Sequence, residues 1–257
     1  MAKTDSPLKQ PINDVLIALH LLTRLPLPGA HWSNDARPHA RAAWAYPLVG
    51  LVVGGISAAT AWSALAIGLP AMLAAGFAIA AAIVVTGAMH EDGLADCADG
   101  FWGGWEPIRR LEIMKDSQIG TYGVLALILV LGLKWAALTS LLASGQVFWL
   151  PVIATVSRAS MVIVMEKLQN ARKSGLSQST GRPGSTALFW AVLIGSVTAL
   201  STGIATGTAL VILSALLTIG MITLSRRKIG GQTGDVLGAT QCIVETSLLV
   251  VLCALVP

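Results

Sequence analysis

Charged residues are scarce in this chain. Asp, Glu, Lys and Arg make up only 12% of its 257 residues, whereas 54% are hydrophobic and the mean hydropathy is +0.73. Average soluble domains carry roughly 25% charged residues, so a soluble core of this size would need far more polar surface. Several apolar runs are about 20 residues long, which is enough to cross a bilayer as a helix. The composition therefore predicts an all-α fold, a polytopic transmembrane helical bundle.

Cysteine motifs and P-loops are also missing. The three cysteines, Cys97, Cys242 and Cys253, show no CxxC spacing, so they suggest neither a disulfide framework nor a zinc site. We interpret them as small buried residues. The glycines of 230–234 follow Lys228 instead of preceding a lysine, and no Gly-Lys-Ser/Thr sequence occurs, which excludes a P-loop.

Seven transmembrane spans are predicted from the apolar runs, with short amphipathic sequence before them. The spans cover about 44–68, 70–89, 119–143, 147–166, 185–203, 205–224 and 236–256. The whole chain, 1–257, is then a single membrane domain with an N-terminal segment at 1–43 and long loops at 90–118, 167–184 and 225–235. The N-terminal stretch INDVLIALHLLTRLPLP is expected to lie on the membrane surface.

Positive charge is absent from alternate loops. Of the 17 Lys and Arg residues, Lys134 and Arg158 lie inside predicted spans, and the remaining 15 all fall in the N-terminal segment or the long loops. By the positive-inside rule, the N-terminus and the long loops face the cytoplasm of an inner membrane, and the C-terminus lies outside. The net charge of +4 mostly reflects this asymmetry, so it indicates no nucleic-acid partner.

The stretch HEDGLADCADGFWGG, which begins at His90, places four carboxylates within nine positions. Asp92, Asp96 and Asp99 are spaced i, i+4, i+7, so a helix continuing the second span presents them on one face within about 60°. A divalent cation would relieve their repulsion, and carboxylate oxygens suit Mg²⁺ or Mn²⁺. Glu91 is a further candidate ligand. The alternative is a solvated acidic loop, and His90 could be a ligand or base only if the helix breaks there.

The stretch RRLEIMKDSQIGTYG, residues 109–123, leads into the third span. Asp116 is a candidate metal ligand, and Arg110 and Lys115 are candidates for holding phosphate oxygens, because Arg offers a bidentate fork and Lys a point charge. Asp116 and Ser117 are also natural helix-start residues, so a capping role is an equal alternative.

The stretch RRKIGGQTGDVLGA, residues 226–239, joins the last two spans. Gly231 and Gly234 precede Asp235, and a glycine-rich loop that feeds a helix N-terminus exposes backbone N–H groups to an anion. The alternative is a flexible turn capped by Asp235. Arg172, in the polar basic loop 167–184, is a further candidate for binding phosphate.

Two ionisable residues, Arg158 and Glu245, fall near the middle of predicted spans. Such groups are functional or paired by default. Arg158 could therefore bind substrate, or the two could pair in a purely structural role. A transporter would also use intramembrane charges, but transporters tend to show repeated halves, and no internal repeat is visible in this sequence.

The motifs HEDGLADCADG, RRLEIMKDSQIGTYG and GGQTGDVLGATQ, in this order and each at a span end, closely resemble the cobalamin synthase family. LTRLPLP at 22–28 and YPLVGLVVG at 46–54 resemble its N-terminal segments, so the resemblance covers nearly the whole chain. It implies a Mg²⁺-dependent transfer in vitamin B12 biosynthesis, in which adenosylcobinamide-GDP and alpha-ribazole, or its 5′-phosphate, give the cobalamin and GMP. The family's acidic positions fall on Asp92, Asp96, Asp99, Asp116 and Asp235.

The residues suit that chemistry, in which a ribose hydroxyl attacks a pyrophosphate. Metal ions held by Asp92, Asp96 and Asp116 would bridge the phosphates, and Arg110, Lys115 and Arg172 would hold other oxygens. The catalytic candidates are Asp92, Asp99 and Asp235, of which the last two are equal candidates for accepting the proton.

One other enzyme family shares part of the acidic motif. DGLAD also resembles the acidic motif of CDP-alcohol phosphotransferases, but Asp96 stands where that motif has Arg, so this family is the alternative. Other enzymes of the pathway are candidate partners at the cytoplasmic loops, and a homo-oligomer is a separate candidate.

Overall fold

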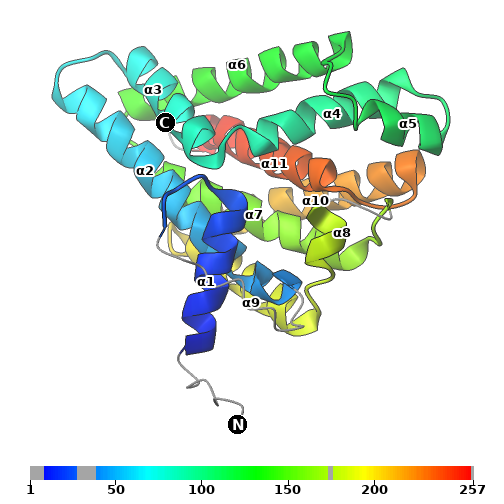
Figure 1. Cartoon of the computed structure of the whole chain (residues 1–257). Coiled ribbons are helices and arrows are strands. Elements are labelled where there is room, and N and C mark those ends of the chain that lie inside the picture. Colours follow the sequence, from blue (N-terminus) through cyan, green and yellow to red (C-terminus); the bar gives the residue numbers. More distant parts are fainter. Residues whose placement is uncertain (1–8, 28–38, 173–175, 256–257) are drawn as a thin grey trace.

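The computed structural model of the protein describes residues 9–27, 39–172 and 176–255. In these ranges no β-sheet occurs, and an isolated bridge joins Asn170 to Gln232. Figure 1 shows a bundle of long helices with α1 along its outer side. In chain order the helices are α1 (Lys9–Leu22), the 3-10 helix η1 (His39–Ala45), α2 (Tyr46–Ala66), α3 (Ala71–Thr86), α4 (Met89–Gly103), α5 (Pro107–Ile113), α6 (Thr121–Ala143), α7 (Trp149–Lys167), α8 (Leu176–Thr180), α9 (Ser185–Leu200), α10 (Ile204–Ile229) and α11 (Gly234–Leu255).

The predicted all-α membrane fold is confirmed, but the count of seven spans is only approximate. Within the described residues, five helices are long and apolar enough to cross a membrane, or six if the bent pair α3–α4 counts as one. The five are Ala40–Ala66, Thr121–Ala143, Trp149–Lys167, Ile204–Ile229 and Gly234–Leu255. The fifth predicted span, 185–203, corresponds to α9, whose 16 residues rise only about 24 Å, less than the roughly 30 Å hydrocarbon core.

The second predicted span does not continue straight into the acidic motif. α3 and α4 are bent by 88° at Gly87 and Ala88, whose φ angles of 65° and 58° are both left-handed. The amide of Ala88 donates to the carbonyl of Ile83 at 2.9 Å, which closes the end of α3. The four carboxylates therefore lie on a separate helix, α4, although their i, i+4, i+7 spacing still places three on one face.

α7 and α11 form the centre of the bundle. In the most apolar 18-residue stretch of each helix, 78% of the residues of α7 and 72% of those of α11 are buried. The corresponding fractions are 22% for α6 and 28% for α10, which face outward. Small residues allow this packing: a Cβ added at Gly50 of α2 would lie 2.2 Å from the carbonyl oxygen of Ala154 in α7. α7 is thus packed closely against α2, and α11 begins at the candidate site.

Three loops meet at one end of the bundle. Arg110, after α4, donates to the carbonyl of Lys228 at the end of α10 (2.8 Å), and the amide of Ala171, after α7, donates to the carbonyl of Gln232 (2.8 Å). Arg172 also donates to the carbonyl of Leu111 at 3.1 Å. The three motifs singled out in the sequence are therefore neighbours in the fold.

Candidate active site

The crossing of α4 over α11 assembles the site. A Cβ added at Gly93 would lie 2.7 Å from the carbonyl oxygen of Asp235, and one added at Gly238 would lie 3.1 Å from His90. Only glycine allows the two helices to approach this closely. Figure 1 shows α4 and α11 side by side along this contact. The acidic face of α4 is thereby brought beside the first turn of α11.

A cleft of about 160 Å³ lies at this crossing. Three charged residues line it: Asp92 of α4, Arg172 of the loop after α7, and Asp235 at the start of α11. Neutral side chains from α8 and the glycine-rich loop complete the lining. The lining residues are Met89, Asp92, Asn170, Arg172, Ser177, Gln178, Gln232, Thr233, Gly234 and Asp235. Two carboxylates and one guanidinium thus surround a space that one or two phosphate groups could enter.

Arg172 is held between two walls of this cleft. Its Nη1 donates to Oδ2 of Asp235 at 3.2 Å, and its Nη2 donates to the carbonyl of Leu111 at 3.1 Å. Its Nε is buried and has no hydrogen-bond partner within the described residues. Two of the five N–H donors of the guanidinium are thus engaged, and Nη1 and Nη2 each keep a second N–H for an incoming oxygen atom.

The wall made by the loop after α7 is fixed to the glycine-rich loop. The amide of Gln232 donates to the carbonyl of Gln169 at 2.8 Å, and the Ser177 hydroxyl bonds both the Asn170 and the Gln232 side chains. A Cβ added at Gly231 would lie 2.4 Å from the carbonyl oxygen of Gln169. Gly231 thus packs against protein backbone, whereas Gly234 lines the cleft, with open space at its Cβ position.

Thr233, not Asp235, caps α11. The hydroxyl oxygen of Thr233 accepts from the amide of Val236 at 3.4 Å and donates to Oδ2 of Asp235 at 3.0 Å. The alternative of a turn capped by Asp235 is therefore wrong. The Asp235 carboxylate is directed to Arg172 and the cleft.

Asp99 supports α6 instead of facing the cleft. Its two carboxylate oxygens accept the amides of Gly120 (2.7 Å) and Gly123 (2.9 Å), and the residue is 8% exposed. A Cβ at either glycine would lie within 2.5 Å of an Asp99 oxygen. The GTYG sequence therefore provides room for a carboxylate from another helix to cap α6, a role that the local sequence suggested for Asp116.

Asp96 is half-buried and lies near two other carboxylates. It is part of α4, outside the five spanning helices. Burial, followed by the negative charges of Asp235 and Asp92, raises the pKa of the half-buried Asp96 to about 7. Asp92 is exposed at the mouth of the cleft, and Oε2 of Glu91 is buried without a hydrogen-bond partner among the described residues. A cation in this region would stabilise the ionised form of all these carboxylates.

The other predicted residues of the second motif lie away from the cleft. Asp116 is exposed, and its Oδ1 accepts the amide of Gln118 at 3.1 Å. Lys115 is exposed, and Arg110 donates to the carbonyls of Gly104 and Lys228, which fixes the α4–α5 turn. α6 begins only at Thr121, so neither Asp116 nor Ser117 starts that helix. The metal role of Asp116 stays a prediction.

The mid-span charges form a buried cluster below the cleft. Nζ of Lys134 pairs with Oε1 of Glu245 at 3.0 Å, and Gln241 bonds the other oxygen of Glu245. Arg158 is 2% exposed and donates to the carbonyl of Ala154, in its own helix, at 3.2 Å. Of the two alternatives for these residues, the Arg158–Glu245 ion pair is therefore wrong, because Glu245 pairs with Lys134. Arg158 does not line the cleft.

The donors of the cleft suit a divalent cation that is shared with substrate. Among the residues described, no group of three or more His, Cys, Asp or Glu side chains is arranged to hold a metal ion. Asp92 and Asp235 nevertheless line one cleft. Mg²⁺ is usually bound by one or two carboxylates plus substrate phosphates, so two carboxylates are the expected protein contribution.

Neutral residues of the cleft gave no signal in the sequence. Asn170, Ser177, Gln178, Gln232 and Thr233 line it without carrying charge. They could have been found only from their position, beside Arg172 or within the glycine-rich loop. The sequence patterns indicated both loops, but only through their charged residues and glycines.

The fold and this cleft define a helical membrane protein with a cleft that is lined by two carboxylates and an arginine. A family model described as cobalamin-5-phosphate synthase matches residues 14–253, and the chain belongs to this family. The resemblance seen in the motifs is thus confirmed. No solved structure matches the chain.

Curated relatives match over nearly their whole length. The chain is 43% identical to the adenosylcobinamide-GDP ribazoletransferase of Azorhizobium caulinodans, over 92% of this chain and 93% of the relative. It is 42% identical to the enzyme of that name from Bradyrhizobium diazoefficiens (95% and 94%) and 45% identical to that from Xanthobacter autotrophicus (89% and 91%). The transporter and CDP-alcohol phosphotransferase alternatives have no such support.

Proposed function

We propose that this chain is an adenosylcobinamide-GDP ribazoletransferase. A ribose hydroxyl of alpha-ribazole, or of its 5′-phosphate, attacks the cobinamide-bound phosphorus of adenosylcobinamide-GDP. A new O–P bond forms, the bond from that phosphorus to the bridging pyrophosphate oxygen breaks, and GMP leaves with that oxygen. The products are adenosylcobalamin, or its 5′-phosphate, and GMP. The hydroxyl proton goes to a carboxylate of the protein.

The observation that carries this proposal is the convergence of Asp92, Arg172 and Asp235 on one cleft. Arg172 binds phosphate oxygens through its terminal nitrogens, above all Nη1, which a phosphate draws away from Asp235. Asp235, once released, has one oxygen to accept the hydroxyl proton and the other to contact the metal ion. Asp99 is a poorer base, because both of its oxygens already accept backbone amides of α6.

Mg²⁺, for which Mn²⁺ could substitute, is the proposed cofactor. Asp92 and Asp235 would hold it together with substrate phosphate, and Asp96 and Glu91 lie on the same helix as Asp92. When bound, the ion supplies charge neutralisation for the pyrophosphate and for the leaving GMP. Support comes from the oxygen donors of the cleft and from the raised pKa of Asp96.

The cleft is proposed to face the cytoplasm of the inner membrane. Its walls come from the loops that carry the Lys and Arg residues, which the positive-inside rule assigns to that side. A reporter enzyme fused after Pro257 tests the orientation, because the predicted seven spans with an inside N-terminus leave that end outside. A cytoplasmic reporter would contradict the assignment or require an even number of spans.

The direct test of activity is GMP release by the purified protein in detergent. Adenosylcobinamide-GDP is supplied with alpha-ribazole or alpha-ribazole 5′-phosphate, with Mg²⁺ or with a chelator. We expect GMP only when donor, acceptor and divalent cation are all present. GMP release without any acceptor would indicate a hydrolase, and release in the chelator would exclude the metal requirement.

A further inference from the structure

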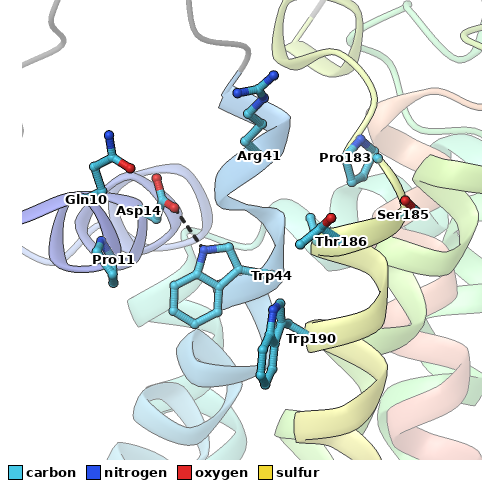
Figure 2. A pocket seen from close by; sticks show the side chains of 11 residues that line it. Gln10, Pro11, Asp14, Arg41, Trp44, Pro183, Ser185, Thr186 and Trp190 are labelled. Atoms are coloured by element: carbon cyan, nitrogen blue, oxygen red, sulfur yellow. Dashed lines mark hydrogen bonds between the residues drawn. The ribbon is translucent and has the colours of Figure 1, made fainter. Parts of the chain in front are cut away.

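A second cavity, of about 860 Å³, lies apart from the acidic cleft and shares none of its lining residues. It is bounded by α1, by η1, by Pro183 and Gly184, and by the first turn of α9. Figure 2 shows Arg41 and the start of α9 around one end, and Trp44 and Trp190 together at the other. The cavity is thus polar at one end and aromatic at the other.

Both signs of charge occur in this cavity. Asp14 of α1 and Arg41 of η1 line it together. Oδ2 of Asp14 accepts the indole N–H of Trp44 at 2.9 Å, which fixes the carboxylate beside the ring and leaves Oδ1 outside that hydrogen bond (Figure 2). A ligand that matches the cavity therefore carries a cation and an anion.

The start of α9 adds donors for the anion. α9 has 16 residues and begins at Ser185 after Gly184, and the amide of Gly184 donates to Oε2 of Glu166 at 2.9 Å, so the amides that follow Gly184 are the ones offered to a ligand. The first amides of a helix lack intrahelical acceptors and favour a negative charge. The hydroxyls of Ser185 and Thr186 also line the cavity. Together with the Arg41 guanidinium, these groups suit a phosphate ester.

An apolar stripe continues from the cavity along α9. Trp190, Leu193 and Val197 are spaced i, i+3, i+7, which places them on one face of the helix. They are 49%, 38% and 56% exposed. A free phosphate would make no use of this stripe, whereas the acyl chain of a lipid would cover it.

We propose that this cavity binds the headgroup of a zwitterionic phospholipid of the phosphoethanolamine type. Its phosphate lies between Arg41 and the first turn of α9, and its ammonium lies at Asp14 and over the indole of Trp44. The acyl chains follow the exposed face of α9. An anionic lipid without an ammonium would leave the Asp14 carboxylate facing a negative charge, so the site discriminates between the two headgroups.

Native mass spectrometry of the purified full chain in detergent tests this assignment, with short-chain phosphatidylethanolamine and phosphatidylglycerol as probes. We expect the wild-type protein to bind phosphatidylethanolamine about 10-fold more tightly. Asp14→Asn keeps an oxygen that can accept the Trp44 N–H but loses the charge, and it should bring the two affinities to within about 2-fold of each other. Arg41→Gln should weaken both by about 10-fold.

Two further variants separate the site from general effects. Arg227→Gln removes an exposed positive charge at the end of α10 and should leave both affinities unchanged. Trp44→Phe loses the indole donor but keeps the Asp14 carboxylate, so this variant should still prefer phosphatidylethanolamine. It provides a second measurement of the preference if Asp14→Asn does not fold. Equal affinities in the wild-type protein would overturn the proposal. So would displacement of the lipid by inorganic phosphate alone at similar concentration, which would identify a free-anion site.

Discussion

Nη1 of Arg172 lies 3.2 Å from Oδ2 of Asp235, although 63 residues separate them in the chain. Their side chains are 22% and 21% exposed, so the pair lies at the edge of the cleft and can be reached by a ligand. An ion pair at this position keeps the carboxylate in place while the site is free of phosphate. In the proposed function, a phosphate group that enters the cleft competes with Asp235 for the same guanidinium.

Arg172→Ala should raise the KM for adenosylcobinamide-GDP by about 10- to 100-fold, because hydrogen bonds to charged groups contribute roughly 1.5–3 kcal/mol. Arg172→Lys should be intermediate, since it keeps the charge but loses the planar fork. Steady-state GMP release at varied donor concentration measures both. Arg182→Ala, which removes a guanidinium that pairs with Glu166 outside the cleft, is the matched control. An unchanged KM in Arg172→Ala would remove Arg172 from substrate binding.

Asp99→Asn should destabilise the protein by about 1–3 kcal/mol, because an amide group cannot accept both N–H bonds from Gly120 and Gly123. Thermal unfolding in detergent gives the change, and GMP release is measured per folded molecule. Turnover per folded molecule should be largely retained. A fully stable Asp99→Asn protein without turnover would instead make Asp99 a ligand or base.

Lys134→Met should destabilise the bundle by about 3–5 kcal/mol, because it leaves the Glu245 carboxylate buried without its cation. The double variant Lys134→Met with Glu245→Gln should recover part of this loss. Thermal unfolding of both single variants and the double variant yields the coupling free energy. Additive losses would mean that the two side chains do not stabilise each other.

Gly93→Ala should disturb the site more than the fold. The added Cβ would lie 2.7 Å from the Asp235 carbonyl and push α4 from the start of α11. Overpacking costs about 1–3 kcal/mol, while a displacement of about 1 Å in a catalytic group can cost on the order of 100-fold in rate. Gly103→Ala, whose Cβ would have its nearest contact at 3.7 Å, is the control on the same helix. Equal turnover in the two variants would show that the crossing tolerates the extra methyl group.

Local patterns in the sequence predicted part of the candidate site, in that Asp92, Arg172, Gly234 and Asp235 line the cleft. The i, i+4, i+7 spacing placed Asp92, Asp96 and Asp99 on one helical face, and the glycine-rich loop was correctly assigned to the start of the last helix. Both features depend on residues fewer than ten positions apart. The all-α membrane fold likewise followed from apolar runs.

Other features depend on contacts between distant segments and could not be predicted. The cap of α6 comes from Asp99, more than 20 residues before the helix amides that it accepts. The partner of Glu245 is Lys134, because α6 packs beside α11. The bend after α3 occurs at Ala88 as well as Gly87, and alanine gives no turn signal.

The measurement that tests the account most directly is GMP release as a function of Mg²⁺ concentration for Asp92→Asn and Asp235→Asn, with Glu112→Gln as the matched control. Glu112 is an exposed carboxylate on α5 that pairs with Arg109. We expect both cleft variants to fold normally but to lose at least about 100-fold in turnover at low Mg²⁺. This corresponds to a loss of roughly 2.7 kcal/mol in transition-state stabilisation. The Glu112→Gln control should keep wild-type turnover. Wild-type turnover in either cleft variant, at every Mg²⁺ concentration, would contradict the assignment of this cleft as the active site.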